Sequence, residues 1–167
     1  MKNKCINLIL LFLFISLITI TVVVCAMNRE SSLPDKEIIL PYDVADTTSY
    51  VFVHIVRDQK CTECEVNALY QWDNVVSMIG RNDILFLFVI EMHPNDTPDI
   101  IAKALSRRPF HQVLYIDYAK DFLNNNSWLQ NRQYKEYNNF LLNNSGRVIA
   151  IGDPLNDLKF MKYMKNL

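Results

Sequence analysis

The segment Tyr50-Val-Phe-Val-His-Ile-Val56 is followed, after four residues, by Cys61 and Cys64 in the stretch Arg57-Asp-Gln-Lys-Cys-Thr-Glu-Cys-Glu65. The first run is almost entirely apolar and rich in β-branched and aromatic residues, which predicts a central strand covered on both faces. After Cys64 the apolar positions follow a three-and-four spacing typical of an amphipathic helix: Ala68, Leu69, Trp72, Val75, Val76 and Ile79. The two cysteines therefore lie where a strand passes into a helix.

This position favours redox chemistry. A thiol at a helix N-terminus meets unpaired backbone N–H groups and the positive end of the helix dipole, and both stabilise the thiolate, which is the reactive form. We expect Cys61 at the exposed first turn and Cys64 one turn further in, closer to the sheet. Lys60 favours the thiolate as well, whereas Glu63 and Glu65 oppose it.

Two other interpretations of the pair stay open. The cysteines can be reduced structural residues, or they can form half of a metal site. A closed zinc site needs about four ligands, and the chain has no second C-x-x-C, so only the fold could bring His54, His93 or His111 to it. His54 lies on an apolar strand, where a core histidine is expected more often than a proton shuttle. The other two histidines are expected to be polar loop residues.

The start of the chain predicts export. Lys2 and Lys4 precede residues 6–27, an uncharged and mostly apolar run long enough to cross a hydrocarbon core of about 30 Å as a helix. Residues 1–27 are predicted to be a membrane anchor or a signal sequence. The pattern Val24-Cys-Ala26 also permits cleavage, and Val22-Val-Val-Cys25 resembles a bacterial lipobox, so lipidation is a further alternative.

The distribution of charge orients this segment. With lysines before the span, the positive-inside rule places the N-terminus in the cytoplasm and the remainder in the periplasm or otherwise outside the cytoplasm. Residues 28–36 are expected to be a linker and residues 37–167 one domain, which is long enough for a single core. The chain carries 17 basic and 18 acidic residues, so its near-neutral balance gives no reason to expect nucleic acid as a partner.

The rest of the chain alternates in type. Strands are expected at residues 37–40, 84–90 and 112–117, a helix at 98–105 and a further helix within 128–137. Residues 139–142 and 147–152 flank Asn143-Asn-Ser-Gly146, which predicts a hairpin. Asp153-Pro-Leu155 then opens a last helix, whose apolar side is expected to comprise Leu155, Leu158, Met161, Met164 and Phe160. The fold class is therefore α/β, with a mixed central sheet flanked by helices and one N-terminal hydrophobic helix.

This order of strand, C-x-x-C, helix, strand, helix, strand, hairpin and terminal helix resembles the thioredoxin fold over about residues 37–167. The exported form resembles the membrane-tethered thiol-disulfide proteins of the TlpA and redoxin group. Phe140-Leu-Leu-Asn-Asn-Ser-Gly-Arg-Val-Ile-Ala-Ile-Gly-Asp-Pro154 is similar to the hairpin and final-helix entry of redoxin-like proteins of Bacteroidetes. The resemblance implies that Cys61 attacks, that Cys64 resolves, and that no cofactor is needed.

The chain departs from that family in three places. It has Lys60, Thr62 and Glu63 where thioredoxins carry Trp before the pair and Gly-Pro within it. It has no proline between Pro109 and Pro154, so residues 137–139 must occupy the place of the family's cis-proline. The strand before the pair also lacks the family's buried acid, because His54 is its only titratable group.

The sequence thus predicts a membrane-tethered, extracytoplasmic thiol-disulfide oxidoreductase that acts on protein thiols or disulfides of the cell envelope. Cys61 and Cys64 are its expected catalytic residues. Two alternatives come from other classes. One is a redox-inactive thioredoxin-fold module that binds another envelope protein, and the other is a metal-binding carrier that uses both cysteines and a further ligand.

Overall fold

The computed structural model describes residues 35–43, 48–57, 61–107 and 110–167. The predicted span at residues 6–27 and the proposed linker up to Pro34 lie outside these ranges. Within them no helix is both long and apolar enough to cross a membrane. The elements in chain order are β1 (Tyr50–Val56), α2 (Thr62–Ala68), α3 (Tyr70–Ile79), β2 (Ile84–Glu91), α4 (Pro98–Arg107), β3 (Val113–Asp117), α5 (Asp121–Asn125), the 3₁₀ helix η1 (Ser127–Gln130), β4 (Asn139–Asn143), β5 (Val148–Ile151) and α6 (Leu158–Lys165).

The strands form one mixed sheet in the order β3-β2-β1-β4-β5. β1, β2 and β3 are parallel, and β4 pairs antiparallel with both β1 and β5. The parallel pairs are joined by crossover helices, whereas β4 and β5 are joined by a hairpin, as expected for these two kinds of pairing. The predicted mixed sheet flanked by helices is therefore confirmed.

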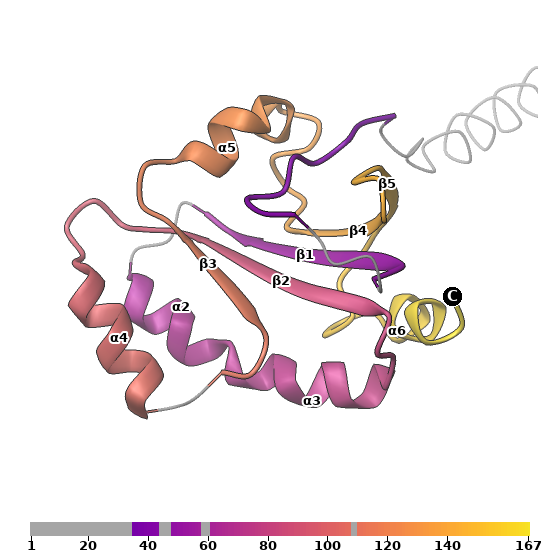
Figure 1. The fold of residues 1–167 in the computed structure, drawn as a ribbon, viewed down its shortest axis with the longest axis horizontal. Helices are drawn as coiled ribbons and strands as arrows, with labels where there is room; N and C mark the ends of the chain where they lie inside the picture. Colours follow the sequence, from indigo (N-terminus) through magenta and orange to yellow (C-terminus); the bar gives the residue numbers. More distant parts are fainter. Residues whose placement is uncertain (1–34, 44–47, 58–60, 108–109) are drawn as a thin grey trace, which may run out of the picture. The chain divides into compact units, whose positions relative to one another are not determined.

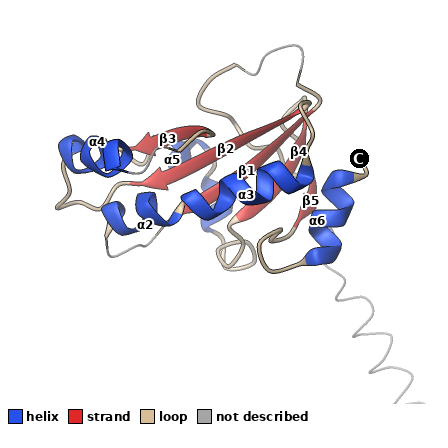
Figure 2. Ribbon diagram, turned by 90° about the horizontal axis from the view of Figure 1, so that it is seen from below, coloured by secondary structure: helices blue, strands red, loops and turns tan. Residues whose placement is uncertain are grey.

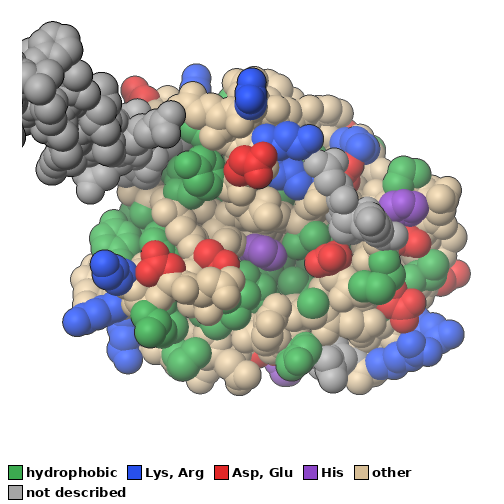
Figure 3. Space-filling view, turned by 180° about the vertical axis from the view of Figure 1, so that it is seen from behind, with side chains coloured by type: hydrophobic (Ala, Val, Ile, Leu, Met, Phe, Trp, Pro, Cys, Tyr) green, Lys and Arg blue, Asp and Glu red, His purple; other side chains and the backbone are tan. Residues whose placement is uncertain are grey.

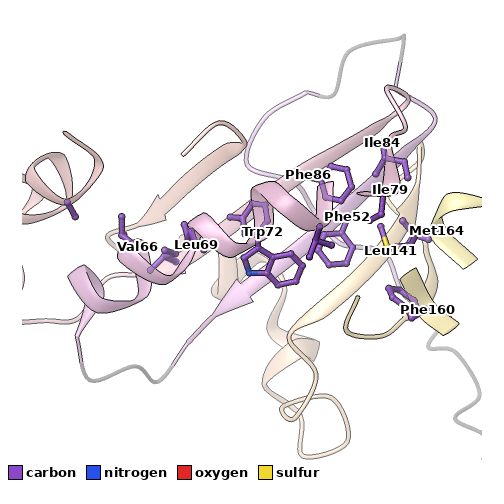
Figure 4. Packing of buried hydrophobic residues seen from close by; sticks show 14 of the residues in the cluster. Phe52, Val66, Leu69, Trp72, Ile79, Ile84, Phe86, Leu141, Phe160 and Met164 are labelled. Carbon is purple, nitrogen blue, oxygen red and sulfur yellow. The ribbon is translucent and has the colours of Figure 1, made fainter. Parts of the chain in front are cut away.

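Helices cover both faces of the sheet, and each face has its own core. Figure 1 shows α2, α3 and α4 on one side of the strands and α5 on the other. In Figure 2, α3 runs across the strands beside α6. The first core joins α2, α3, α4 and α6 to the sheet through residues that include Val66, Trp72, Phe52 and Met164 (Figure 4). Ile101 of α4 belongs to the same core. The second packs Phe122, Leu123 and Leu129 against the opposite sides of β1, β2 and β4.

The predicted single helix after the cysteines is interrupted at Leu69, which separates α2 from α3. At this point two hydrogen bonds span three residues instead of the four of an α-helix: Leu69 N–H donates to the Val66 carbonyl, and Trp72 N–H donates to the Leu69 carbonyl. An ideal α-helix would rotate residues spaced by three gradually away from the sheet, whereas a 3₁₀-like turn holds them in line. The tight turn therefore keeps Val66, Leu69, Trp72 and Val75 all buried.

The hairpin is confirmed, but the predicted strand at residues 37–40 is wrong. That segment makes a single antiparallel bridge, from Glu37 to Arg147. Two backbone bonds support it, from Ile38 N–H to the Gly146 carbonyl and from Val148 N–H to the Lys36 carbonyl. Ile38 is buried and Leu40 is partly buried, and both pack against the core, whereas Ile39 is exposed. The ladder pairing of residues 37–40 with the hairpin is limited to this bridge.

The last helix begins later than predicted. The Asp153 carboxylate accepts from Leu155 N–H and forms a local turn, so residues 154–156 are not helical. Asp157 is the actual N-cap, because its carboxylate accepts from Lys159 N–H at 2.8 Å and from Phe160 N–H at 3.2 Å. Leu158, predicted to belong to the apolar side, is 74% exposed, while Phe160 and Met164 are buried as expected.

The helix expected within residues 128–137 is also placed wrongly. Most helical residues lie earlier, in α5 and at the start of η1, and only residues 128–130 of η1 fall within the predicted range, while residues 132–136 form turns. Asn126 joins the two short helices through its buried side chain, whose amide donates to the carbonyls of Phe122 and Ile39. Its side-chain oxygen accepts from Ile39 N–H. One asparagine thus links this region to the segment before β1, a contact that no periodic pattern reveals.

Candidate active site at the Cys61–Cys64 disulfide

The two cysteines form a disulfide at the start of α2. Cys61 is the N-cap residue, with extended backbone angles, and Cys64 is the third residue of the helix. Their Cα atoms lie 5.3 Å apart. Cys64 N–H donates to Cys61 Sγ at 3.2 Å, so this sulfur occupies the place where a capping side chain usually accepts. The predicted position of the pair, between a buried strand and a helix, is confirmed.

The exposure of the two cysteines is the reverse of the prediction. Cys64 is exposed and Cys61 is only partly exposed. The cause is the orientation of α2, which buries Thr62 and Val66, one turn apart on the same side. Cys64 follows Thr62 by two residues, which places its side chain about 200° around the helix. It therefore faces solvent instead of the sheet.

The acidic residues of α2 are partly balanced by the neighbouring helix. Arg107, the last residue of α4, pairs with Glu63 at 3.1 Å. Both side chains are exposed enough for water to screen this pair, which keeps its contribution small.

The face seen in Figure 3 has basic and acidic side chains interspersed with apolar ones. That face therefore has no continuous basic surface of the kind that binds nucleic acid.

The loop after β2 contacts the first turn of α2, which the sequence analysis did not foresee. Thr62 N–H donates to Asp96 Oδ2 at 3.0 Å, and His93 N–H donates to Thr62 Oγ1 at 2.9 Å. Thr62 is fully buried. β1 and β2 are parallel neighbours, so the loops after them meet at the same edge of the sheet. That topological rule was the available signal for Asp96.

His54 has the surroundings of a core residue. Its Nδ1 lies 2.6 Å from Asn139 Oδ1, and its ring centroid lies 4.7 Å from that of Trp72 and 5.5 Å from that of Phe88. Burial lowers the pKa of His54, against smaller upward effects of the Asn139 hydrogen bond and the charge of Asp153. The imidazole is therefore neutral at pH 7, as the core interpretation predicts.

The other two histidines have separate surroundings. His93 Nδ1 accepts from Asn95 N–H, and His111 Nδ1 lies 3.1 Å from Asp73 Oδ2. In the part of the chain that the structure describes, no cluster of three or more His, Cys, Asp or Glu residues has the geometry to hold a metal ion. None of the three histidines is therefore brought to the cysteines as the further ligand of the metal-carrier alternative in this part of the chain.

Residues 137–139 lead directly into β4 beside the end of β1. Ile55 N–H donates to the Asn138 carbonyl, and His54 and Asn139 are paired in register. No cis peptide bond occurs among the described residues. The segment borders a cavity of about 210 Å³ whose lining is Glu136, Tyr137, Asn138, Asn139, Ile151, Gly152 and Asp153. The chain therefore enters β4 through residues 137–139, none of which is a proline.

Two buried acidic groups lie at the ends of β2 and β3. Glu91 and Asp117 are register partners in the parallel pair, and Glu91 is ion-paired with Lys120. Burial raises the pKa of Asp117. The sequence predicted neither of these buried acids, because the comparison with the thioredoxin pattern concerned only the strand before the cysteines. Each ends a strongly apolar strand pattern, which is the signal that was available.

The mixed sheet, its flanking helices and the disulfide at the strand-to-helix turn define a thioredoxin-like fold. No protein-family model and no curated protein matches the chain. Among solved structures, the solution structure of a thioredoxin-like protein in the oxidized form is 14% identical, with a TM-score of 0.52, over 81% of this chain and 93% of that one. This likeness confirms the predicted thioredoxin-like fold.

Other matches share less of the structure. A putative thiol-disulfide oxidoreductase from Bacteroides vulgatus is 13% identical over 71% of this chain and 72% of that one, with a TM-score of 0.44. A thioredoxin-like protein from Bacteroides caccae ATCC 43185 is 18% identical over 70% of this chain and 40% of that one, with a TM-score of 0.43.

Proposed function

We propose that this chain is a thiol-disulfide oxidoreductase in which Cys61 and Cys64 exchange a disulfide with protein partners. The observation that carries the proposal is the bond from Cys64 N–H to Cys61 Sγ at the first turn of α2. When the disulfide is reduced, the same N–H and the helix dipole are in place to stabilise a thiolate on Cys61. Cys64, three residues on, is close enough to close the ring again.

The exchange proceeds in two steps. In the reduced protein the Cys61 thiolate attacks one sulfur of a partner disulfide, which forms a mixed disulfide and releases the other partner sulfur as a thiolate. The Cys64 thiolate then attacks Cys61 Sγ, forms the internal disulfide and releases the second partner sulfur. Each released thiolate takes a proton from water when the pH is below its pKa. Two electrons pass to the partner, and the reverse sequence oxidises a partner dithiol.

We also propose that the domain acts outside the cytoplasm, tethered through residues 6–27. The support is the length of that apolar run and the lysines before it. An oxidising compartment also allows a disulfide such as Cys61–Cys64 to persist between catalytic cycles. A membrane-impermeant maleimide applied to intact, mildly reduced cells tests the location. We expect it to label the two cysteines without lysis, and labelling only after lysis would contradict the proposal.

The activity itself is tested with the full chain purified in detergent. We expect it to catalyse dithiol-dependent reduction of insulin, measured as turbidity, and to come to equilibrium with glutathione. Cys61→Ser should abolish catalysis, while Cys25→Ser serves as the matched cysteine control and should retain it. Absence of catalysis by folded wild-type protein with every small dithiol reductant would reject the oxidoreductase and leave the binding module.

A further inference from the structure

The loop between β2 and α4 holds the first turn of α2 through a set of three linked residues. Asp96 Oδ2 accepts from Thr62 N–H at 3.0 Å. The Thr62 hydroxyl oxygen accepts from His93 N–H at 2.9 Å. One short loop segment therefore bonds to both the backbone and the side chain of Thr62.

These contacts fix a negative charge at the first turn of α2. Hydrogen bonding to Thr62 lowers the pKa of Asp96, with a smaller contribution from the charge of His93, so its carboxyl group is ionised at neutral pH. Thr62 is fully buried and follows Cys61 directly in the chain. The Asp96 carboxylate and Cys61 Sγ thus accept from two N–H groups of the same helical turn, those of Thr62 and Cys64.

We propose that Asp96 is a positioning residue that sets the redox balance of the Cys61–Cys64 pair, by placing a fixed negative charge at the same helical turn as the thiolate that forms on reduction. The inference rests on the proposed function for its biological meaning. Its physical basis is independent of it, since a carboxylate at the helix N-terminus takes up part of the positive field that would otherwise stabilise the thiolate. The disulfide form is favoured as a result.

Other charged groups near this turn act differently. Glu63 and Glu65 lie on α2 itself, and Glu63 is paired with Arg107 of α4. Asp99, in the first turn of α4, is exposed. His93, in the same loop as Asp96, faces it and adds positive charge when protonated. Among these described groups, Asp96 is the carboxylate that accepts directly from the backbone of the first turn.

The test is the Asp96→Asn substitution in the full chain. The amide oxygen can still accept from Thr62 N–H, so the substitution removes the charge and retains the loop contact. We expect the pKa of the Cys61 thiol, followed by pH-dependent alkylation, to fall. We expect the equilibrium constant for reduction of the disulfide by two glutathione thiols to rise about two- to fivefold, the size typical of one charge at a helix end.

Matched substitutions separate charge from structure. Asp99→Asn removes an equal charge from the next helix and should leave both quantities unchanged. Thr62→Ser keeps the hydroxyl and should also retain the wild-type values. Asp96→Ser removes the charge and keeps an acceptor oxygen, so it repeats the test if Asp96→Asn does not fold. A folded charge-removed variant with an unchanged or raised thiol pKa would overturn the proposal.

The outcome is separable from that of the proposed function. The thiol pKa and the glutathione equilibrium are properties of the two cysteines, and both can be measured even if the protein reduces no protein disulfide. Wild-type protein that reduces no insulin, together with a shifted glutathione equilibrium in Asp96→Asn, would reject the enzyme and retain the tuning role. Insulin reduction by the wild type, together with an unshifted equilibrium in Asp96→Asn, would retain the enzyme and reject the tuning role.

Discussion

The side chains of His54 and Asn139 form a hydrogen bond across the β1–β4 pair, with 2.6 Å between Nδ1 and Oδ1. Because the amide oxygen can only accept, Nδ1 carries the proton of the neutral imidazole. The ring lies against Trp72 and Phe88 on the face that α3 covers. The bond thus satisfies one polar edge of a histidine inside the apolar core and holds the segment before β4 against β1.

The first prediction concerns pH. Burial lowers the pKa of His54 below 6.5, so the unfolded chain binds this proton at a higher pH than the folded protein does. The contribution to stability is full above the unfolded pKa and is lost as the pH falls through the folded one. Urea unfolding across about pH 5 to 8 should show this loss of stability toward acid.

Substitution of the histidines checks the assignment. His54→Gln should flatten the acid side of that stability profile, whereas His111→Gln should leave its shape unchanged, since His111 is exposed. A profile that keeps its full slope in His54→Gln would show that another group titrates there. Asn139→Ala should cost about 1–3 kcal/mol, because it leaves a buried donor without its acceptor.

The second prediction separates the roles of the cysteines. With Cys64→Ser, the mixed disulfide on Cys61 has no resolving thiol, so covalent partner complexes should accumulate and be visible on non-reducing gels. Cys61→Ser should trap few. The exposure of Cys64 makes the opposite outcome a sharp test: complexes that accumulate in Cys61→Ser instead would assign the attacking role to Cys64.

The third prediction compares two glycines with positive φ. A Cβ at Gly146, where φ is +83°, would lie 2.9 Å from the Ile38 carbonyl oxygen, whereas a Cβ at Gly80, where φ is +65°, would meet its nearest atom at 3.6 Å. Gly80→Ala should cost about 1 kcal/mol from backbone strain alone. Gly146→Ala should cost more by chemical denaturation. Equal losses of stability in the two variants would show that residues 36–38 can move away from the added methyl group without lowering the free energy of unfolding further.

The fourth prediction concerns Arg57, the first residue after β1. Its guanidinium donates to the Leu129 carbonyl at 2.9 Å and to the Tyr137 carbonyl, so it joins η1 to the segment before β4. Leu129 is fully buried. Arg57→Met should therefore lower the free energy of unfolding by about 1–3 kcal/mol. Arg132→Met, at an exposed position, is the matched control, and similar losses in both would refute the structural role.

The parts of the fold that a local pattern encodes were predictable from sequence. The apolar runs that become β1 and β2, and the turn Asn143-Asn-Ser-Gly146 between β4 and β5, are recognisable because residue type alone favours them. The cysteine pair was placed correctly for the same reason. Its exposure was not, because the rotation of α2 depends on contacts of Thr62 with a loop more than thirty residues away.

The sequence alone also could not decide which of two similar local patterns the fold uses. Asp153 and Asp157 are both suitable caps, and the position of Phe160 and Met164 in the core selects Asp157. Residues 37–40 have a strand composition, yet only Ile38 is buried. Asp96 carries no motif of its own, and its importance depends on the parallel pairing of β1 with β2. Long-range packing decides each of these cases.

The bridge between Glu37 and Arg147 has a mechanical consequence. The backbone bonds at Lys36 and Ile38 fasten the chain to the β4–β5 hairpin before it reaches β1. A pull exerted from the N-terminal side would load those bonds and the buried Ile38 anchor first. These bonds to the hairpin would then have to break before the force reaches β1, the strand that leads to the cysteines.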